Sequence, residues 1–264
     1  MAKAKERIDK LLFERGLVET RSKSQAIIMA GEVLVEGEPV TKAGQKVPVD
    51  AHIEIVAPAP FVSRGGYKLS EALERFDIDV SGQVCADVGA CTGGFTDVLL
   101  QRNASRVYAI DVGYGQLAWN LRNDARVRVM ERTNVRYLGS LAEQVSFIAI
   151  DVSFISLKLV LPTVSAWLEN QGDIVSLIKP QFEAGREKVG KGGIVRDPEV
   201  HRLVLSNILN WSKQRDFGPY DLIRSPITGS GGNIEFLLHL RPGRSESAVI
   251  DELIDKVIPG ETIS

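Results

Sequence analysis

Four charged residues stand at the expected ends of strands or helices, where a side chain can reach a ligand. They are Lys68, Asp151, Lys179 and Glu235. Asp151 and Lys179 directly follow apolar runs, and a charged residue after a buried strand of an open α/β sheet points into the crevice where ligands bind. Any one of the four could instead form a strand-end salt bridge. Four together, with Asp151 and Lys179 on successive strands, are harder to explain as separate salt bridges and favour a site that carries chemistry.

A second candidate site is the glycine turn that follows the strand-like residues 84–88. It runs through Asp87, Gly89 and Gly93-Gly94, and Asp111 ends the next expected strand. An α/β sheet commonly holds an adenosine with a strand, a glycine turn, a helix and a second strand that ends in an acid. The Asp111 carboxylate could accept hydrogen bonds from both ribose hydroxyls.

The spacing of these glycines excludes the dinucleotide fingerprint. A turn that cradles a pyrophosphate has the pattern G-x-G-x-x-G, whereas Ala90 and Cys91 follow Gly89. The Asp87 carboxylate would repel a phosphate but could hold a cation. The turn therefore favours S-adenosyl-L-methionine, which has an ammonium and a sulfonium and no phosphate, although a plain structural turn or a nucleotide site stays open.

The expected cofactor contacts lie on the turn and at the ends of the next strands. They are Asp87, Gly89, Gly93 and Asp111, with Asn134 after the third strand, where the adenine edge is usually met. We expect Phe154 to pack in the core rather than to flank the methyl donor or a base. The three histidines (His52, His201 and His239) lie in no motif, so the sequence predicts neither a metal site nor a histidine base.

Composition describes an ordinary globular protein. The 264 residues are 44% hydrophobic and 25% charged, with a net charge of −2, so nucleic-acid binding would need local clusters of basic residues. No apolar run approaches the length of about 18 residues that a membrane helix needs, and the charged N-terminus does not resemble a secretory signal. The spacing of Cys85 and Cys91 suits neither a zinc site nor a disulfide, which favours a reduced, cytoplasmic protein.

The pattern predicts two domains: residues 1–56, a proline-containing linker at 57–62, and residues 63–264. The larger domain alternates strands and helices as in a doubly wound α/β fold. Its strands are expected at 84–88, 107–111, 127–130, 146–151, 173–178, 221–225 and 234–240. Asp197-Pro198 predicts the start of a helix that Gly218 ends.

The first 56 residues resemble the S4 RNA-binding domain. The resemblance lies in residues 7–12, 20–26 and 31–37, within two expected helices and a strand. In that family the two helices present basic and polar side chains to folded RNA. Residues 1–30 carry a net charge of +3, and the contacts expected with RNA are Arg7, Arg21 and Lys23. A solvated helical face is the alternative.

Five further blocks resemble the TlyA family, historically called hemolysin A, within the FtsJ-like ribose 2′-O-methyltransferases. They are residues 63–69, 87–100, 150–157, 178–183 and 231–238. That group uses a Lys-Asp-Lys-Glu tetrad, and the four residues named first match its order. The resemblance implies an α/β, Rossmann-like methyltransferase sheet (FtsJ-like) behind a small α+β S4 domain. One departure is Cys91, where the family commonly has serine.

The resemblance also implies a substrate and partners. It implies transfer of a methyl group from S-adenosylmethionine to the ribose of a cytidine in ribosomal RNA, on naked RNA or a ribosomal subunit, with no membrane involved. Lys179 would accept the proton of the 2′-hydroxyl or position that hydroxyl. A catalytically silent ribosome-assembly module and a cytolysin are the alternatives. The sequence does not predict the oligomeric state.

Overall fold

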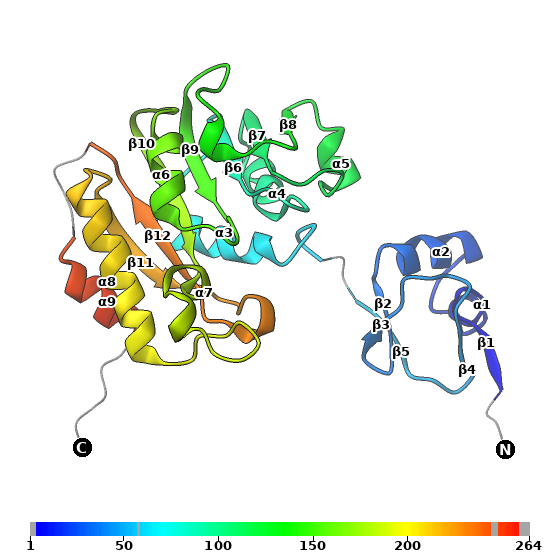
Figure 1. The fold of residues 1–264 in the computed structure, drawn as a ribbon. Helices are drawn as coiled ribbons and strands as arrows, with labels where there is room; N and C mark the ends of the chain where they lie inside the picture. The colour runs from blue at the N-terminus through cyan, green and yellow to red at the C-terminus, as the bar shows by residue number, and fades with distance from the viewer. Residues whose placement is uncertain (1–3, 57–58, 244–247, 259–264) are drawn as a thin grey trace. The chain divides into compact units, whose positions relative to one another are not determined.

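The chain divides into two compact units, Met1–Pro60 and Phe61–Ser264, in a computed structural model that describes residues 4–56, 59–243 and 248–258 (Figure 1). Residues 57–58 of the predicted linker lie outside the described residues. The first unit has a hydrophobic core of its own, separate from the clusters of the second.

The first unit packs two helices beside short strands. Its elements are β1 (Lys5–Arg7), α1 (Ile8–Glu14), α2 (Arg21–Met29), β2 (Val33–Val35), β3 (Glu38–Pro39), β4 (Lys46–Pro48) and β5 (Ile53–Ile55). The Thr20 side chain caps α2 by accepting a hydrogen bond from the Lys23 amide, as its residue type predicts. β2 lies between β3 and β5, and β1 pairs with β4. The sequence did not predict β1, β3 or β4, because two- and three-residue strands carry too little periodicity.

The second unit is built on a seven-stranded sheet with the order β11-β12-β10-β9-β6-β7-β8. The strands are β6 (Val84–Val88), β7 (Arg106–Ile110), β8 (Val127–Met130), β9 (Val145–Ile150), β10 (Leu168–Ile178), β11 (Pro219–Arg224) and β12 (Phe236–Leu240). All seven expected strands are confirmed. The five strands from β8 to β10 pair in parallel, whereas β12 runs antiparallel to both of its neighbours.

Helices cover both faces of this sheet (Figure 1). They are α3 (Gly65–Arg75), α4 (Gly94–Gln101), α5 (Trp119–Arg122), α6 (Leu157–Ser165), α7 (Pro180–Glu183), α8 (Pro198–Gln214) and α9 (Ile250–Val257), with short 3-10 turns at Val135–Tyr137, Arg186–Lys188 and Ser230–Gly232. Side chains alternate between two cores along β9: Phe147 packs with α3 and α4, and Ile148 packs with α6 and α8. Asp197 caps α8 as predicted.

The topology brings the expected site residues to one edge of the sheet. β6, β7, β9 and β10 run in parallel, so the loops after them leave at the same edge. The antiparallel β12 begins at that edge, which places Glu235, the residue before it, beside the other loops. A site at this edge can therefore draw on residues that are far apart in the sequence.

Candidate active site

The four charged residues form two close ion pairs. The Lys68 Nζ donates a hydrogen bond to Glu235 Oε2 at 2.6 Å, and both side chains are buried. The Lys179 Nζ lies 2.6 Å from Asp151 Oδ1 and donates a hydrogen bond to the Ser153 hydroxyl at 2.8 Å. Each lysine thus faces a carboxylate, which keeps two ammonium groups near the same edge of the sheet without net charge.

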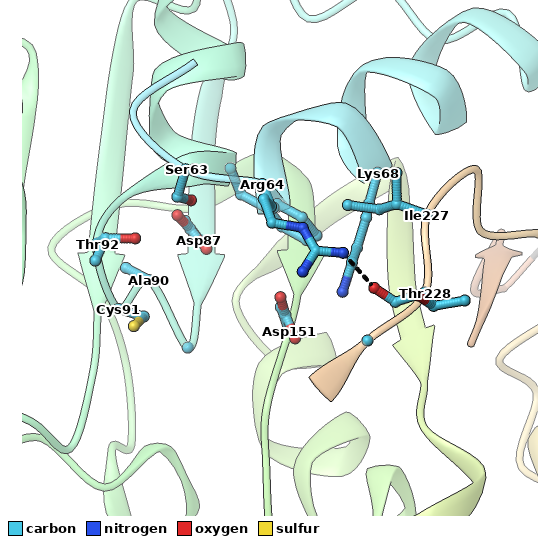
Figure 2. A pocket seen from close by; sticks show the side chains of 15 residues that line it. Ser63, Arg64, Lys68, Asp87, Ala90, Cys91, Thr92, Asp151, Ile227 and Thr228 are labelled. Carbon is cyan, nitrogen blue, oxygen red and sulfur yellow. Dashed lines mark hydrogen bonds between the residues drawn. The ribbon is translucent and has the colours of Figure 1, made fainter. Parts of the chain in front are cut away.

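Lys68 and Asp151 line one cavity of about 200 Å³ between the glycine turn and the start of α3. Figure 2 shows both side chains directed toward this opening, and Arg64 spans it to donate a hydrogen bond to the Thr228 carbonyl at 2.8 Å. Asp87 lines the same cavity from the end of β6. The cavity therefore presents two carboxylates and two cationic side chains.

Asp87 is fully buried, and only one of its oxygens is satisfied. Its Oδ2 accepts hydrogen bonds from the amide and the hydroxyl of Thr96, at 2.8 and 2.7 Å. Within the described part of the chain, no donor reaches its Oδ1. The pKa of Asp87 is raised to about 7, mainly by burial and to a smaller extent by the nearby acids Asp151 and Asp111, against the lowering effect of the Thr96 hydrogen bonds. An unpaired buried carboxyl oxygen fits a cationic ligand, because a cation would stabilise the charged form.

A second cavity of about 780 Å³ adjoins the first and shares Gly89, Cys91 and Asp151 with it. Asp111 lines this cavity and holds the glycine turn, because its Oδ2 accepts a hydrogen bond from the Cys91 amide at 2.8 Å. Gly89 has a φ of 90°, and a Cβ there would lie 2.3 Å from the Asp151 carbonyl oxygen. Only glycine lets the turn after β6 approach the turn after β9 this closely.

The two remaining expected cofactor residues have different surroundings. Asn134 lines the larger cavity, and its side chain accepts a hydrogen bond from the Arg136 amide at 3.1 Å. Gly93 lines neither cavity. Its φ of 96° starts α4, and a Cβ there would lie 2.3 Å from a Leu121 methyl carbon, so Gly93 serves the turn and its packing.

The expectation that Phe154 packs in the core is wrong. Its side chain is 89% exposed at the rim of the larger cavity, and its ring lies 4.8 Å from the ring of Phe182. The residue has a φ of 63°, the left-handed region, which turns the side chain out of the fold. The Lys179 Nζ lies 6.0 Å from the Phe182 ring, so these aromatic residues stand beside the Lys179–Asp151 ion pair.

Sequence reasoning also missed Phe182 and Glu183. The only available indication was their place three and four residues after Lys179, where a loop follows a strand. Glu183 accepts hydrogen bonds from Ser156 and Leu157 across the neighbouring loop. These contacts depend on how two loops meet, which no local pattern shows.

In the first unit, a buried acid organises two of the three expected RNA contacts. Arg7 makes two hydrogen bonds to the Asp9 carboxylate, at 3.0 and 2.9 Å, and Arg21 makes one at 3.2 Å. These cations hold the pKa of Asp9 far below its usual value. Lys23 lies apart from this group, 3.5 Å from Glu19. The sequence analysis did not single out Asp9.

Neither a metal site nor a membrane span is found where the structure describes the chain. Across residues 4–56, 59–243 and 248–258, no three histidine, cysteine or acidic side chains gather in a way that could hold a metal ion. Within the same ranges, no helix is both long and apolar enough to cross a membrane.

Residues 61–242 match the FtsJ-like methyltransferase family, and residues 6–53 match the S4 domain. The chain belongs to the FtsJ-like methyltransferase family. It thus has an N-terminal S4 domain followed in the sequence by a methyltransferase domain, which confirms the expected fold class.

Relatives in this family resemble the chain over nearly its whole length. It is 43% identical to TlyA of Mycobacterium tuberculosis, a 16S/23S rRNA (cytidine-2′-O)-methyltransferase, over 89% of each chain. It is 44% identical to hemolysin A of Brachyspira hyodysenteriae, over 88% of this chain and 98% of the relative. A solved structure from Streptococcus thermophilus that carries the hemolysin name shares 44% identity and a TM-score of 0.73, over 96% of this chain and 95% of that one. The expected TlyA resemblance is confirmed.

Proposed function

We propose that this FtsJ-like methyltransferase transfers a methyl group from S-adenosylmethionine to the ribose 2′-hydroxyl of a cytidine in ribosomal RNA. The observation that carries the proposal is the Lys179–Asp151 ion pair beside two adjoining cavities, with Lys68–Glu235 at the same sheet edge. A ribose hydroxyl is a weak nucleophile, so the protein must align it and manage its proton.

The residues of the site fit S-adenosylmethionine. The unpaired Asp87 Oδ1 suits the cationic methionine end, and Asp111, at the end of β7, suits the ribose hydroxyls. Arg64 lines the same cavity as Asp87 and could meet the ligand carboxylate. When bound, the cofactor supplies a methyl group already activated on a sulfonium sulfur. A dinucleotide would instead bring phosphates close to Asp87 and Asp151.

Lys179 is best suited to orient the 2′-hydroxyl. The sequence left open whether it accepts the proton or positions the oxygen. Its contacts with Asp151 and Ser153 favour the second role, because an ammonium in an ion pair is a hydrogen-bond donor. The ammonium would hold the 2′-oxygen in line for attack and stabilise negative charge that develops on it. As the new carbon–oxygen bond forms, the bond from the methyl carbon to the sulfonium sulfur would break, and the hydroxyl proton would pass to solvent.

The exposed ring of Phe154 and the half-buried ring of Phe182 beside it are suited to hold the base of the target nucleotide. Aromatic side chains bind unstacked RNA bases through their faces. Phe154 is exposed at the rim of the cavity that Asp151 lines, so a base on its ring would keep the attached ribose near the Lys179–Asp151 pair. This arrangement favours a nucleotide that is turned out of its helix.

The choice of ribosomal RNA and of cytidine rests on the relatives, and the S4 unit supports it. TlyA of M. tuberculosis acts on cytidines of 16S and 23S rRNA, by its name. Arg7 and Arg21 are held in place by Asp9, which lets two planar guanidinium groups meet phosphates in a fixed orientation. We propose that the S4 unit recruits folded rRNA, naked or in a ribosomal subunit, and that the protein acts in the cytoplasm.

The decisive experiment incubates the full chain with labelled S-adenosylmethionine and either ribosomal subunits or naked rRNA. We expect label on the 2′-oxygen of a cytidine. The position can be found because a 2′-O-methylated nucleotide resists alkaline cleavage of the RNA chain. K179A should abolish transfer and keep cofactor affinity, whereas the exposed, distant K213A should behave as the wild type. Activity of K179A close to that of the wild type would refute the assigned role.

Two other outcomes would replace the proposal. Cofactor binding without transfer to any ribosomal substrate would make the protein an assembly module. Lysis of liposomes by the pure protein would support the cytolysin that the hemolysin name suggests.

A further inference from the structure

Glu183 joins the loop after β9 to the helix α7 after β10, two segments that carry the reacting groups, although it lies outside the tetrad. It is the last residue of α7, and its Oε2 accepts a hydrogen bond from the Ser156 hydroxyl at 2.6 Å. Its Oε1 accepts a second hydrogen bond from the Leu157 amide at 2.8 Å. The carboxylate therefore bridges the segment after β10 to the segment after β9.

These two segments supply most of the groups that would meet the substrate nucleotide. Asp151 and Phe154 lie on the first segment, and Lys179 and Phe182 lie on the second. Their direct contacts are one ion pair, one ring contact and one hydrogen bond to Ser153, all near the opening of the site. Among these contacts, the hydrogen bonds of Glu183 lie farthest in sequence from the Lys179–Asp151 pair in both segments.

The first segment needs such an anchor. Phe154 has a positive φ and an almost fully exposed ring, so its own packing contributes little to holding it. A bulky residue in the left-handed region persists only where the surrounding structure holds it there. The Asp151 amide donates to the Val88 carbonyl, and Val152 and Ile155 pack against the core on either side of Ser153 and Phe154. Glu183 holds the far end, at the start of α6.

We propose that Glu183 is a positioning residue: it fixes the loop of residues 151–156 against α7, so that the Phe154–Phe182 face and the Lys179–Asp151 pair receive the nucleotide together. The inference rests on the proposed function and deepens it. Glu183 acts through the two loops and touches neither the nucleotide nor the cofactor.

A purely structural role for Glu183 has different consequences. The first amides of a helix lack partners within the helix, and Glu183 satisfies one of them at the start of α6. If that were its whole role, its loss would lower stability and leave the kinetics unchanged. Asp197 provides a matched control, because it also satisfies a first-turn amide, that of Glu199 in α8, away from the site.

The test compares E183A, E183Q and D197A in the full chain, with ribosomal RNA as the methyl acceptor. E183A should lower kcat/KM for RNA by roughly 10- to 100-fold, the scale of a misplacement near 1 Å. Its affinity for S-adenosylmethionine should stay near that of the wild type. E183Q should recover most of the loss, because an amide can accept from the Leu157 amide and donate to the Ser156 oxygen. D197A should lower the melting temperature alone.

A double-mutant cycle with F154A decides whether Glu183 acts through the loop. In the F154A background, E183A should cost much less than in the wild type, because the aromatic face that it positions is already gone. An equal loss in both backgrounds would overturn the proposal, as would E183A kinetics that match those of D197A.

Amide hydrogen exchange separates this proposal from the proposed function. E183A should speed exchange in residues 151–157 and 181–183, and D197A should not. If the wild type methylates no RNA, the proposed function has failed, but faster exchange in these segments would still show that Glu183 holds the loop. Unchanged exchange there would refute its positioning role whatever the activity.

Discussion

Asp87 should make the stability of the larger unit depend on pH in an unusual direction. Burial raises the pKa of its carboxyl from the usual 3.8 to about 7 in the folded protein. A group with a raised pKa binds its proton more tightly in the folded state, so its contribution is complete below pH 4 and is lost as pH rises toward 7. D87N removes this titration, and the asparagine oxygen can still accept both hydrogen bonds from Thr96.

The size of the effect follows from the two pKa values. Between pH 4.5 and 7.5, ionisation of Asp87 should lower the free energy of unfolding of the wild type by about 3 kcal/mol, at about 1.4 kcal/mol per pKa unit. D87N should lack this decrease. Its absolute stability is a separate matter, because the new amide nitrogen would be buried where no acceptor is described.

Urea denaturation at a series of pH values measures the difference. Every tryptophan of the chain (Trp119, Trp167 and Trp211) lies in the larger unit, so their fluorescence follows that unit alone. Other carboxyl groups titrate in both proteins and cancel in the comparison. Parallel pH dependences for the wild type and D87N would refute a raised Asp87 pKa.

Two further predictions concern the RNA. F154A should remove one base stack, which weakens RNA binding by about 1–3 kcal/mol and raises KM for RNA. The melting temperature should change little because the ring is 89% exposed. Methyl-transfer kinetics and thermal denaturation test this, and an unchanged KM would contradict base stacking. R21Q should weaken RNA binding and reduce the dependence of log affinity on log salt by about 0.7–0.9. Filter binding at several salt concentrations measures that slope, which should stay unchanged if Arg21 is only a solvated charge.

The parts of the fold that local pattern controls could be predicted from the sequence. The strands of the sheet are apolar runs bounded by glycine or charge, and Asp111, Asp151 and Lys179 follow three of them directly. Because parallel strands end at one edge, these residues were expected to lie near one another. In the structure all three follow strands that end at the same edge of the sheet.

The contacts that depend on how separate segments meet could not be predicted. Phe154 follows an apolar strand, so composition favours burial, but one positive φ turns its ring outward. Asp9 holds two arginines from separate segments: Arg7, which precedes α1, and Arg21, which begins α2. Its role appears only because α2 packs against α1. Glu183 is important because two loops lie side by side. In each case the residue type is ordinary and only the tertiary contact is informative.

The Lys68–Glu235 pair has a consequence for folding during translation. Its two partners are separated by 167 positions in the sequence, one in the first helix of the larger unit and the other just before its last strand. A chain that is still emerging during translation has Lys68 but no Glu235, and β10 still lacks β12 along one side. The Lys68–Glu235 pair can therefore form only after residue 235 has been synthesised, so a shorter nascent chain lacks this part of the candidate site.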